Sequence, residues 1–479
     1  RSRTAWNFIG SGDDSGIYKT NDGGKTWNLL TTENSGFPTG EGLGRIGLAI
    51  YDSNTLYAVL DNQFRREDKS TENFDLERID FKDMTVDQLL KLEDKKLESF
   101  LRQNGFSRDK SSKTIKSKIQ KGELVPNDLY KFLTDANAEL FDTPVIGAEV
   151  YKSVDSGVTW AKQNDEYLDG VYNSYGYYFG RIHVSPKDSN QIYIYGVPII
   201  KSNDSGKTFT RIGASNVHVD HHDLWINPKN TNHLVLGNDG GVNISYDQGK
   251  NWIKLNQPSV GQFYAINVDN SEPYNVYGGL QDNGVWMAKN TSVESPSWYE
   301  SGHNNWTKIM GGDGMHIQID SRNNNIVYTG LQFGNYYRLD LSKQSRKNIK
   351  PKHKLGESPL RFNWQTPILI SPHNQDIIYF GSNKLHRSFN MGDDWENISG
   401  DLTQGGKKGN VPYGTIASFD ESTFSFGKIV VGSDDGKVSL TENSGDTWKD
   451  IGNNLPKDLW VSRVIFSKID SNKIYLTLN

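Results

Sequence analysis

Short stretches of alternating apolar and polar residues, separated by turns rich in Gly, Asn, Asp and Ser, run along most of this chain. Alternation with a period of two predicts β-strands that bury one face, and the turn residues predict tight connections between them. One apolar pair recurs after an Asn- or Ser-rich turn. Its copies are Leu56-Tyr57, Ile192-Tyr193, Leu234-Val235, Val276-Tyr277, Val327-Tyr328, Ile378-Tyr379, Ile429-Val430 and Ile474-Tyr475. This spacing predicts a repeated unit of about 45–50 residues, the length of four strands.

A second repeat marks the turns. It reads Ser/Thr, any residue, Asp/Asn, any residue, Gly, two residues, then Trp or Phe, and its six copies span 20–27, 153–160, 202–209, 245–252, 388–395 and 441–448. We expect the Asp or Asn to accept hydrogen bonds from backbone N–H groups two or three residues on. The Gly supplies a positive φ, and the aromatic ring anchors the turn on apolar surface. These structural turn positions are Asp22, Asp155, Asp204, Asp247, Asn390 and Asn443.

Two independent repeats in one phase predict an all-β fold, a β-propeller of four-stranded blades. Seven complete blades and one split or incomplete blade fit into the chain, if the long interval between Asp247 and Asn390 holds two blades whose turn motif has decayed. Residues 1–31 supply the later strands of a blade, and residues 461–479 supply the first two. Either these ends pair and close an eight-bladed ring, or the chain is a fragment of a longer one with further domains. We expect the fragment.

Residues 64–146 do not follow the strand repeat and predict an α-helical insertion, between the first blades at 1–63 and the remaining blades at 147–479. Thr85 and Gln88 form a capping-box pattern. Apolar residues at near-helical spacing follow. A third helix is expected to start at Pro126, and helix outside this insertion should be close to nil. The apolar positions of the first helices are Leu89, Leu90, Leu97, Phe100 and Leu101, and those of the third are Leu129, Leu133, Ala136 and Leu140.

The helical insertion also carries a basic stretch. Six Lys and Arg residues lie between Arg108 and Lys121, and acidic residues flank them. A solvated helix face is the simpler interpretation. The alternative is a docking surface for a partner, since large insertions at propeller rims often carry recognition.

Composition agrees with an all-β chain of many turns, which has 47 Gly, 12 Trp and 23 Tyr among 479 residues. The net charge of −5 gives no indication of a nucleic-acid partner, and no apolar run is long enough to span a bilayer. Cysteine is absent, which excludes disulfides and thiolate chemistry but does not decide the compartment. We expect no cofactor, because the chain has no phosphate-cradling loop or dinucleotide fingerprint.

The candidate functional residues lie where the first strand of each repeat begins. In a propeller this strand lines the central channel, so its start lies at one mouth. The expected first strands are 44–50, 180–185, 222–227, 263–268, 314–320, 366–371, 414–419 and 462–467. The candidate ligand-binding residues at these starts are Arg45, Arg181, His221, His222, Gln262, Tyr264 and Arg463, and the candidate catalytic residues are Asp223 and Asp313. The simplest alternative is a water-filled channel whose charges pair with one another.

The turn motif resembles the Asp-box, or BNR, repeat. The stretches 222–228, 278–284, 311–314 and 362–370 resemble bacterial proteins of the sortilin-like (VPS10-type) BNR-propeller group, which are often labelled glycosyl hydrolases. The resemblance covers nearly the whole chain outside the insertion and implies the propeller fold. It implies little about activity, because Asp boxes on blade rims serve folding in proteins of different function. Members of this group usually run longer, and the Cys-rich module that follows the propeller in sortilins has no counterpart here.

Three functional hypotheses follow for the mouth. Arg45, Arg181 and Arg463 would hold a carboxylate in the manner of sialidases, if ring closure brought the third arginine to the others. A glycoside hydrolase needs two carboxylates about 5–5.5 Å apart for retention or roughly 6.5–9.5 Å for inversion. Asp223 and Asp313 are then the expected acid/base pair, and Asp282 is a further candidate that also fits an ordinary turn. The third hypothesis is a mouth that binds a peptide or protein.

A metal site is a weaker hypothesis. His218, Asp220 and His222 would share one face of a strand, but the outer two lie about 13 Å apart at the backbone. We therefore expect no metal.

The sequence as a whole favours an exported or cell-surface binding propeller of a bacterium that engages protein, peptide or glycan through its mouth or its helical insertion. A glycoside hydrolase is the alternative, so enzymatic activity stays undecided at this level.

Overall fold

The computed structural model describes residues 2–66, 76–134, 145–173, 175–255, 260–293, 305–456 and 459–479. The chain divides into two compact units, and each is described by itself. Unit 1 consists of Arg1–Arg66, Leu140–Ile317 and Lys408–Val411, and unit 2 consists of Glu67–Glu139, Gln318–Lys407 and Pro412–Asn479.

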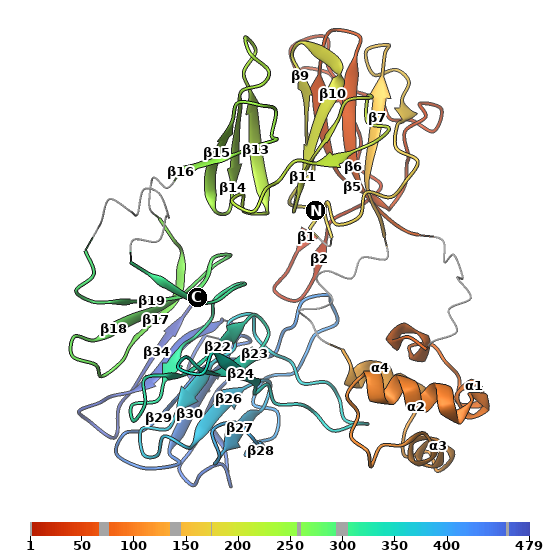
Figure 1. Cartoon of the computed structure of the whole chain (residues 1–479). Coiled ribbons are helices and arrows are strands. Elements are labelled where there is room, and N and C mark those ends of the chain that lie inside the picture. Colours follow the sequence, from red (N-terminus) through yellow and green to blue (C-terminus); the bar gives the residue numbers. More distant parts are fainter. Residues whose placement is uncertain are drawn as a thin grey trace. The chain divides into compact units, whose positions relative to one another are not determined.

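Unit 1 contains β-strands only, among its described residues (Figure 1). Its two-stranded sheets are β1 (Ser2–Arg3) with β2 (Phe8–Ile9), and β3 (Tyr18–Lys19) with β4 (Asn28–Leu29). Its four-stranded sheets are β5 (Leu43–Ile50), β6 (Leu56–Arg65), β7 (Val145–Ser153) and β8 (Ala161–Lys162); β9 (Arg181–Ser185), β10 (Asp188–Tyr195), β11 (Ile199–Ser202) and β12 (Thr210–Arg211); β13 (His221–Ile226), β14 (Leu234–Asn238), β15 (Gly241–Ser245) and β16 (Ile253–Leu255); and β17 (Phe263–Val268), β18 (Asn275–Leu280), β19 (Gly284–Lys289) and β20 (Thr307–Met310).

Unit 2 combines strands with a helical segment. The helices are η1 (Arg78–Phe81), α1 (Val86–Lys91), α2 (Asp94–Gln103), α3 (Ser112–Gln120) and α4 (Pro126–Phe132). The four-stranded sheets are β21 (Gln318–Ile319), β22 (Ile326–Leu331), β23 (Asn335–Asp340) and β24 (Ser345–Asn348); β25 (Ile368–Ile370), β26 (Ile378–Gly381), β27 (Leu385–Ser388) and β28 (Glu396–Asn397); and β29 (Ile416–Glu421), β30 (Ile429–Ser433), β31 (Val438–Thr441) and β32 (Lys449–Asp450). The strands β33 (Val461–Phe466) and β34 (Ile474–Leu478) form a two-stranded sheet.

The described residues thus form seven four-stranded antiparallel sheets, and in each one the strands are paired in chain order. Several first strands of consecutive sheets contact each other within a unit: β5 contacts β9, β9 contacts β13, β21 contacts β25 and β29 contacts β33. This order and these contacts fit a β-propeller, in which every sheet is one blade. The expected first strands agree with β5, β9, β13, β17, β25, β29 and β33 to within about two residues at most ends, whereas β21 is shorter than expected.

The second strand of most four-stranded sheets carries a buried tyrosine. Tyr57, Tyr193, Tyr277, Tyr328 and Tyr379 are at most 1% exposed, and each lies in the second strand of its four-stranded sheet. A buried tyrosine contributes a large apolar area and keeps one hydroxyl group, which usually finds a hydrogen-bond partner. Tyr57 donates its hydroxyl to Ser189 O at 2.7 Å, so this side chain joins its own sheet to the next one.

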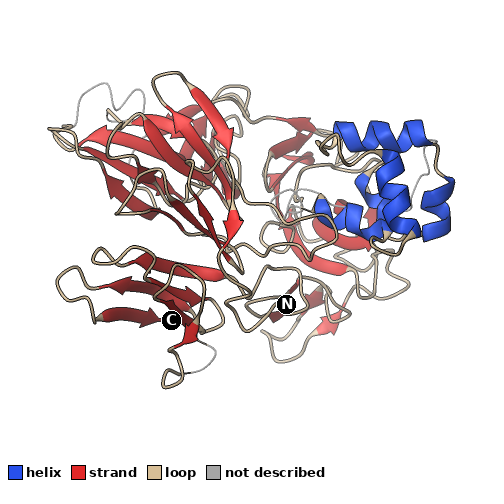
Figure 2. Cartoon of the chain, turned by 90° about the horizontal axis from the view of Figure 1, so that it is seen from below, coloured by secondary structure: helices blue, strands red, loops and turns tan. Residues whose placement is uncertain are grey.

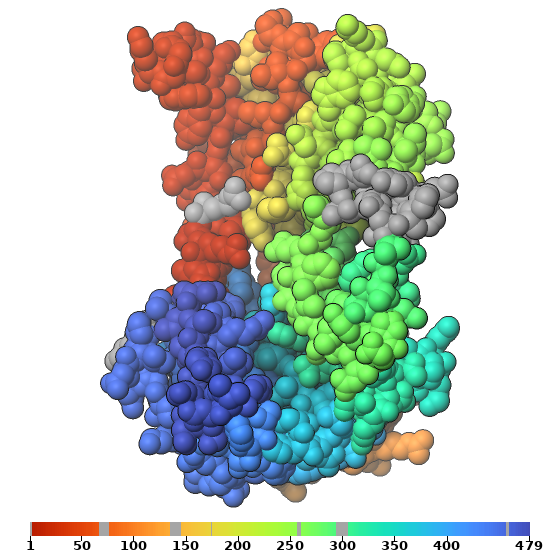
Figure 3. Space-filling model, turned by 90° about the vertical axis from the view of Figure 1, so that its left-hand side faces the viewer, coloured from red at the N-terminus to blue at the C-terminus, as the bar shows by residue number. Residues whose placement is uncertain are grey.

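The sheet of β33 and β34 differs from the others in its second strand. Tyr475, the counterpart of the buried tyrosines, is 55% exposed. Figure 3 shows these last residues (dark blue) at the surface.

All six turn motifs have the same hydrogen-bonding arrangement. The Ser or Thr hydroxyl accepts from the N–H of the Gly four residues on, at 2.8–3.0 Å. The expected bond from three residues on is present at Asp204, which accepts from Lys207 N at 3.1 Å. The bond that all six copies share comes from an N–H four residues on, at 2.8–3.0 Å. The reason is that two consecutive residues have positive φ: the Gly and the residue before it, which includes Gln248 and Met391. Two left-handed residues reverse the chain tightly and bring the fourth N–H onto the carboxylate.

The aromatic residue of the motif is buried where an earlier part of the chain covers it. Trp160 and Trp252 are 5% and 6% exposed, and Phe209 is half-buried. Trp252 donates its indole N–H to Ile212 O, just after the last strand of the preceding sheet. Trp27 is 59% exposed, so its expected burial is wrong. Trp160 is covered by the ring of Phe37, which lies 5.7 Å from its own.

Replacing Asp204 with alanine is expected to lower the free energy of unfolding by about 1 kcal/mol and to leave ligand binding unchanged. Its carboxylate accepts from Ser202 Oγ at 2.7 Å, from Thr208 N at 3.0 Å and from Thr208 Oγ1 at 2.6 Å. Chemical denaturation measures the loss. Asp204→Asn is the control, because asparagine occupies this position in two copies of the motif. Weaker binding at an unchanged unfolding midpoint would contradict a purely structural role.

Every helix among the described residues lies between Arg78 and Phe132 (Figure 2, blue). The capping box of Thr85 and Gln88 is present at the start of α1. Four short α-helices replace the three expected, and α4 begins at Pro126 but ends at Phe132. Ala136 and Leu140, expected on its face, lie outside the described residues. The helices enclose a core of their own, made of Phe81, Leu89, Leu97, Phe100, Leu101, Phe106, Ile115, Ile119, Leu124 and Leu129.

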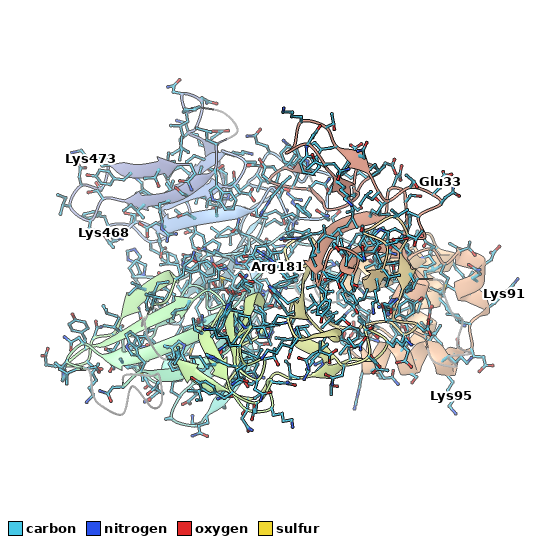
Figure 4. The ribbon with its side chains drawn as sticks, turned by 90° about the horizontal axis from the view of Figure 1, so that it is seen from above. Glu33, Lys91, Lys95, Arg181, Lys468 and Lys473 are labelled. Atoms are coloured by element: carbon cyan, nitrogen blue, oxygen red, sulfur yellow. The ribbon has the colours of Figure 1, made fainter. Side chains whose placement is uncertain are left out.

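The helical segment packs against the loop after β24. Leu355 joins the helical core from this loop, and the rings of Phe132 and His353 meet edge to face at 5.6 Å. Lys91 and Lys95 extend away from the helices (Figure 4). A docking role for the basic stretch between Arg108 and Lys121 stays a prediction.

Candidate functional site

A β-bulge recurs near the start of the first strand in five sheets. The pairing shifts by one residue within β5, β13, β17, β29 and β33. In β13, for example, His221 faces Asn238 and Asp223 faces Gly237, so His222 has no residue opposite. Bulges bend a strand and re-aim its side chains, and they are common beside functional sites. Three candidate residues, Arg45, His222 and Tyr264, lie at these bulges.

Four candidate ligand-binding residues line one cavity in unit 1. This cavity has a volume of about 150 Å³ and is lined by Arg45, Tyr178, Phe179, Arg181, His221 and His222. The sequence reasoning missed Tyr178 and Phe179, because the loop before β9 carries no repeat signal.

The two histidines of this cavity differ in environment. His221 is 2% exposed, and its Nδ1 has no hydrogen-bond partner among the described residues. Burial, followed by the charges of His218 and His222, lowers the pKa of His221 to about 4, so the ring is neutral near pH 7. His222 Nε2 is hydrogen-bonded to Asp239 Oδ1, and its ring meets that of Tyr178 edge to face at 5.5 Å. Asp239 therefore fixes the orientation of His222.

The two arginines carry the positive charge of the cavity. Arg45 Nη1 donates to Tyr178 O at 2.6 Å, which positions its guanidinium group. A Cβ on Gly180 would lie 3.2 Å from Arg45 Cγ and Cδ, and Gly180 has a φ of +99°, so glycine is required for this close passage. Arg181 starts β9 and is exposed. Its guanidinium makes no hydrogen bond or ion pair with any residue that the structure describes.

A carboxyl pair lies beside this cavity, in the hairpin turn after β18 and the loop before β21. The N–H of Asp282 donates to Asp313 Oδ1 at 2.7 Å, and the two side chains are also hydrogen-bonded to each other. Burial, the charge of Asp313 and the charge of Asp239 raise the pKa of Asp282 to about 7. Burial also raises the pKa of Asp313, against the hydrogen bonds from Asp282. Two carboxyl groups in contact cannot both be ionised easily, so the pair shares one proton near neutral pH.

Two further carboxyl groups belong to this acidic cluster. Asp239 contributes its backbone as well, since its N–H donates to Asp220 O at 3.2 Å. Burial, followed by the charge of Asp239, raises the pKa of Asp220 to about 6. Asp220 and Asp282 have φ values of 63° and 60°, although neither is glycine. Strained backbone of this kind is concentrated at functional sites.

The cluster also joins two sheets of unit 1. His218 Nε2 is 3.1 Å from Asp282 O, and Asn283 Nδ2 donates to Asp239 O at 3.3 Å. The loop before β13 and the turn after β14 are thereby held against the turn after β18.

The remaining candidate residues lie apart from this arrangement. Asp223, expected to pair with Asp313, instead accepts from Tyr195 Oη at 3.2 Å and lies 3.9 Å from His183 Nε2, with 71% of its side chain exposed. Gln262 is exposed and Tyr264 is half-buried in unit 1, and neither lines the cavity. Arg463 is an exposed residue of β33 in unit 2. The structure therefore combines Asp313 with Asp282, the further candidate that also fits an ordinary turn, and not with Asp223.

The described part of the chain contains no group of three or more His, Asp or Glu side chains arranged to hold a metal ion. Nor is any of its helices both long and apolar enough to cross a membrane.

The fold and this site define a predominantly β protein whose sheets fit a propeller. No protein-family model matches the chain, and no curated protein matches it. Among solved structures, it is similar to the GH74 enzyme of Niastella koreensis, with 12% identity and a TM-score of 0.26 over 98% of this chain and 67% of that one. It is also similar to the GH74 xyloglucanase of Xanthomonas campestris, with 11% identity and a TM-score of 0.28 over 92% and 64%.

A third similar structure is YCF48 bound to D1 peptide, with 11% identity and a TM-score of 0.23 over 69% of this chain and 83% of that one. The chain spans 64% of the length of the Xanthomonas enzyme.

Proposed function

We propose that this chain is a β-propeller binding module that captures a protein, peptide or glycan ligand at the starts of the first strands of unit 1. In this proposal the seven four-stranded sheets are complete blades, and the two-stranded sheets belong to a split or incomplete blade. The resemblance of the turn motif supports a module exported from a bacterium or held at its surface.

The observation that carries this proposal is the cavity. Arg45, Arg181, His221 and His222 come from three different sheets and line one space of about 150 Å³. A ligand site combines a concave surface with a few convergent polar groups. Arg181 has no ion-pair partner among the described residues, and His221 Nδ1 has no hydrogen-bond partner there. Charges that only paired with one another across a water-filled channel would not leave Arg181 without a partner.

A glycoside hydrolase is the second candidate, and the Asp282–Asp313 pair favours it. A carboxyl group that keeps its proton near pH 7 is suited to general acid catalysis. Hydrogen-bonded carboxyl groups, however, are closer than the separation of about 5–5.5 Å that retention requires or the larger one for inversion. The pair therefore fits neither geometry as it stands, and we favour binding over hydrolysis.

Two screens test the proposal. A glycan array and a library of acetylated tetrapeptides are each applied to the wild type, to Arg181→Gln and to Arg211→Gln. Arg211 is an exposed residue at the far edge of the same sheet and serves as the matched control. We expect binding in one library that Arg181→Gln weakens and Arg211→Gln does not. No Arg181-dependent binding in either library would defeat the proposal.

A glycan-hydrolysis assay distinguishes the second candidate. We expect the wild type to be inactive towards glycans. Robust cleavage that Asp313→Asn abolishes would replace the binding module with an enzyme.

A further inference from the structure

Unit 2 contains a groove between two consecutive sheets, with a volume of about 680 Å³. One wall comes from β23 and β24 and includes Arg338 and Lys347. The other comes from the turn motif of residues 388–395 and includes Phe389 and Asp393. This unit 2 groove shares no lining residue with the cavity of unit 1.

The carboxylates that line the unit 2 groove are all paired with cations. The ion pairs are Asp393 with Arg338 (2.9 Å) and Lys347 (2.7 Å), Asp340 with Lys343 (2.9 Å), and Asp376 with Arg322 (2.7 Å). Arg346 also lines the groove, and its guanidinium lies over the Tyr337 ring at 5.2 Å. An anion that approaches the paired cations also meets their carboxylates, so attraction and repulsion largely cancel. The same holds for a cation, and the pairs therefore favour an uncharged ligand.

Each of these pairs places hydrogen-bond acceptors and donors side by side. A carboxylate has about four acceptor sites and an ammonium group several donors, so Asp393 and Lys347 keep some of theirs for a ligand. Arg338 is positioned by a second contact, since its Nη1 also donates to Met391 O at 2.9 Å. A sugar hydroxyl both donates and accepts, so it needs an acceptor next to a donor. The lining thus matches a ligand rich in hydroxyl groups.

Phe389 adds apolar area to this polar wall. It is 55% exposed, and the Arg387 guanidinium lies over its ring at 4.8 Å. The second position of the turn motif, which Phe389 occupies, carries Asn, Val, Asn, Tyr and Glu in the other five copies. The turn itself therefore does not require an aromatic residue there. An exposed aromatic ring beside groups that bind hydroxyls can hold the C–H face of a sugar ring.

The volume of the groove sets the length of the ligand. A water molecule occupies about 30 Å³ of liquid, so about 680 Å³ holds roughly twenty groups of that size. Two linked hexose residues have a similar number of heavy atoms.

We infer that the unit 2 groove binds a neutral oligosaccharide, with one sugar ring on Phe389 and its hydroxyl groups shared between Asp393 and Lys347. This site goes beyond the proposed function, because it lies in unit 2 and does not involve Arg181. It holds the glycan without cleaving it. The hydrogen bond from Lys347 lowers the pKa of Asp393, so this carboxylate lacks the proton that a general acid needs near pH 7.

The test uses an array of neutral, carboxylated and sulfated oligosaccharides, followed by calorimetry on the best ligands. We expect neutral glycans to bind, with an affinity that changes less than about twofold between about 50 and 300 mM salt. A preference for carboxylated or sulfated glycans that weakens steeply over this range would overturn the inference and assign the groove to anions.

Phe389→Asn tests the aromatic wall, since asparagine occupies this motif position in two other copies. We expect binding of the neutral glycan to weaken by about fivefold or more at an unchanged melting temperature. Tyr246→Asn is the matched control, because Tyr246 is the 59% exposed aromatic residue at the same motif position in unit 1, and it should change nothing. Equal affinity for the wild type and Phe389→Asn would overturn the inference.

Asp393→Asn tests the paired charges and should weaken the neutral glycan by about tenfold. If this variant does not fold, the comparison of Phe389→Asn with Tyr246→Asn decides alone. Tighter glycan binding by Asp393→Asn would contradict a carboxylate that accepts from sugar hydroxyls.

The failure of this inference can be told from that of the proposed function. Glycan binding that Arg181→Gln abolishes and Phe389→Asn leaves unchanged would overturn the groove site and keep the module of unit 1. Glycan binding that depends on Phe389, with no Arg181-dependent ligand, would keep the groove site and overturn the proposed function.

Discussion

Replacing Glu421 with leucine is expected to lower the free energy of unfolding by about 3 to 5 kcal/mol. Glu421 ends β29 and is fully buried. Its carboxylate accepts from Ser371 Oγ at 2.6 Å, Tyr379 Oη at 2.8 Å and Gly427 N at 2.8 Å. Leucine has a similar size but no acceptor, so three buried donors lose their partner at once, each at a cost of about 1–3 kcal/mol. Denaturant unfolding followed by tryptophan fluorescence measures the change.

Two variants control this measurement. Glu421→Gln keeps one carbonyl oxygen for Tyr379 and Gly427 and is expected to lose less than half as much stability as leucine. Glu442→Gln changes a carboxylate that is 70% exposed and should stay within about 0.5 kcal/mol of the wild type. A loss below about 1 kcal/mol for Glu421→Leu would show that the three donors find other acceptors.

Replacing Asp282 with asparagine is expected to stabilise the protein by about 2 kcal/mol at pH 7–8 and to leave it nearly unchanged at pH 4. Folded Asp282 has a pKa raised to about 7, whereas the unfolded chain has the ordinary value of 3.8. Between these values the folded protein keeps a proton that the unfolded chain has lost. Stability from this group is therefore complete below pH 3.8 and is lost as the pH rises through 7. Asparagine cannot ionise and removes the dependence.

The melting temperature between pH 4 and pH 8 checks this prediction. Asparagine tolerates the positive φ of position 282 almost as well as aspartate, so the substitution changes the charge and little else. Asp165→Asn is the matched control, because Asp165 is an exposed residue of the same unit. Parallel pH profiles for the wild type and Asp282→Asn would show that the Asp282–Asp313 pair does not share a proton.

The sheets of this protein could be predicted from its sequence because each one is local. Four consecutive strands pair in chain order, so strand positions follow from the repeat without knowledge of distant contacts. The same logic located Arg45, Arg181, His221 and His222, which begin first strands and do line one cavity.

The pairing of Asp282 with Asp313 was not predicted, although both were candidates, because it depends on how two sheets meet. Asp239 and Asp282 also fit ordinary residues of the turns between second and third strands. In an antiparallel sheet that turn lies at the same end as the start of the first strand. The position of this turn can be read from the repeat, and it would have placed both Asp239 and Asp282 near Asp313. The alternation rule also failed for Asp223, because the bulge at His222 shifts every later side chain of β13 relative to the expected pattern.

The helical segment interrupts a hairpin, and this has a consequence for how the chain can change. β6 pairs with β7 from Leu56↔Ser153 to Arg65↔Val145, with residues 66–144 between them. The entropy of closing a loop grows only with the logarithm of its length. Lengthening a turn from about four to about eighty residues therefore costs only about 2.5 kcal/mol. Burying a single large apolar side chain, such as Leu60, offsets this, at about 1.5–3 kcal/mol. The connection between β6 and β7 is thus a point at which a whole folded segment can be gained, exchanged or removed while the sheet persists.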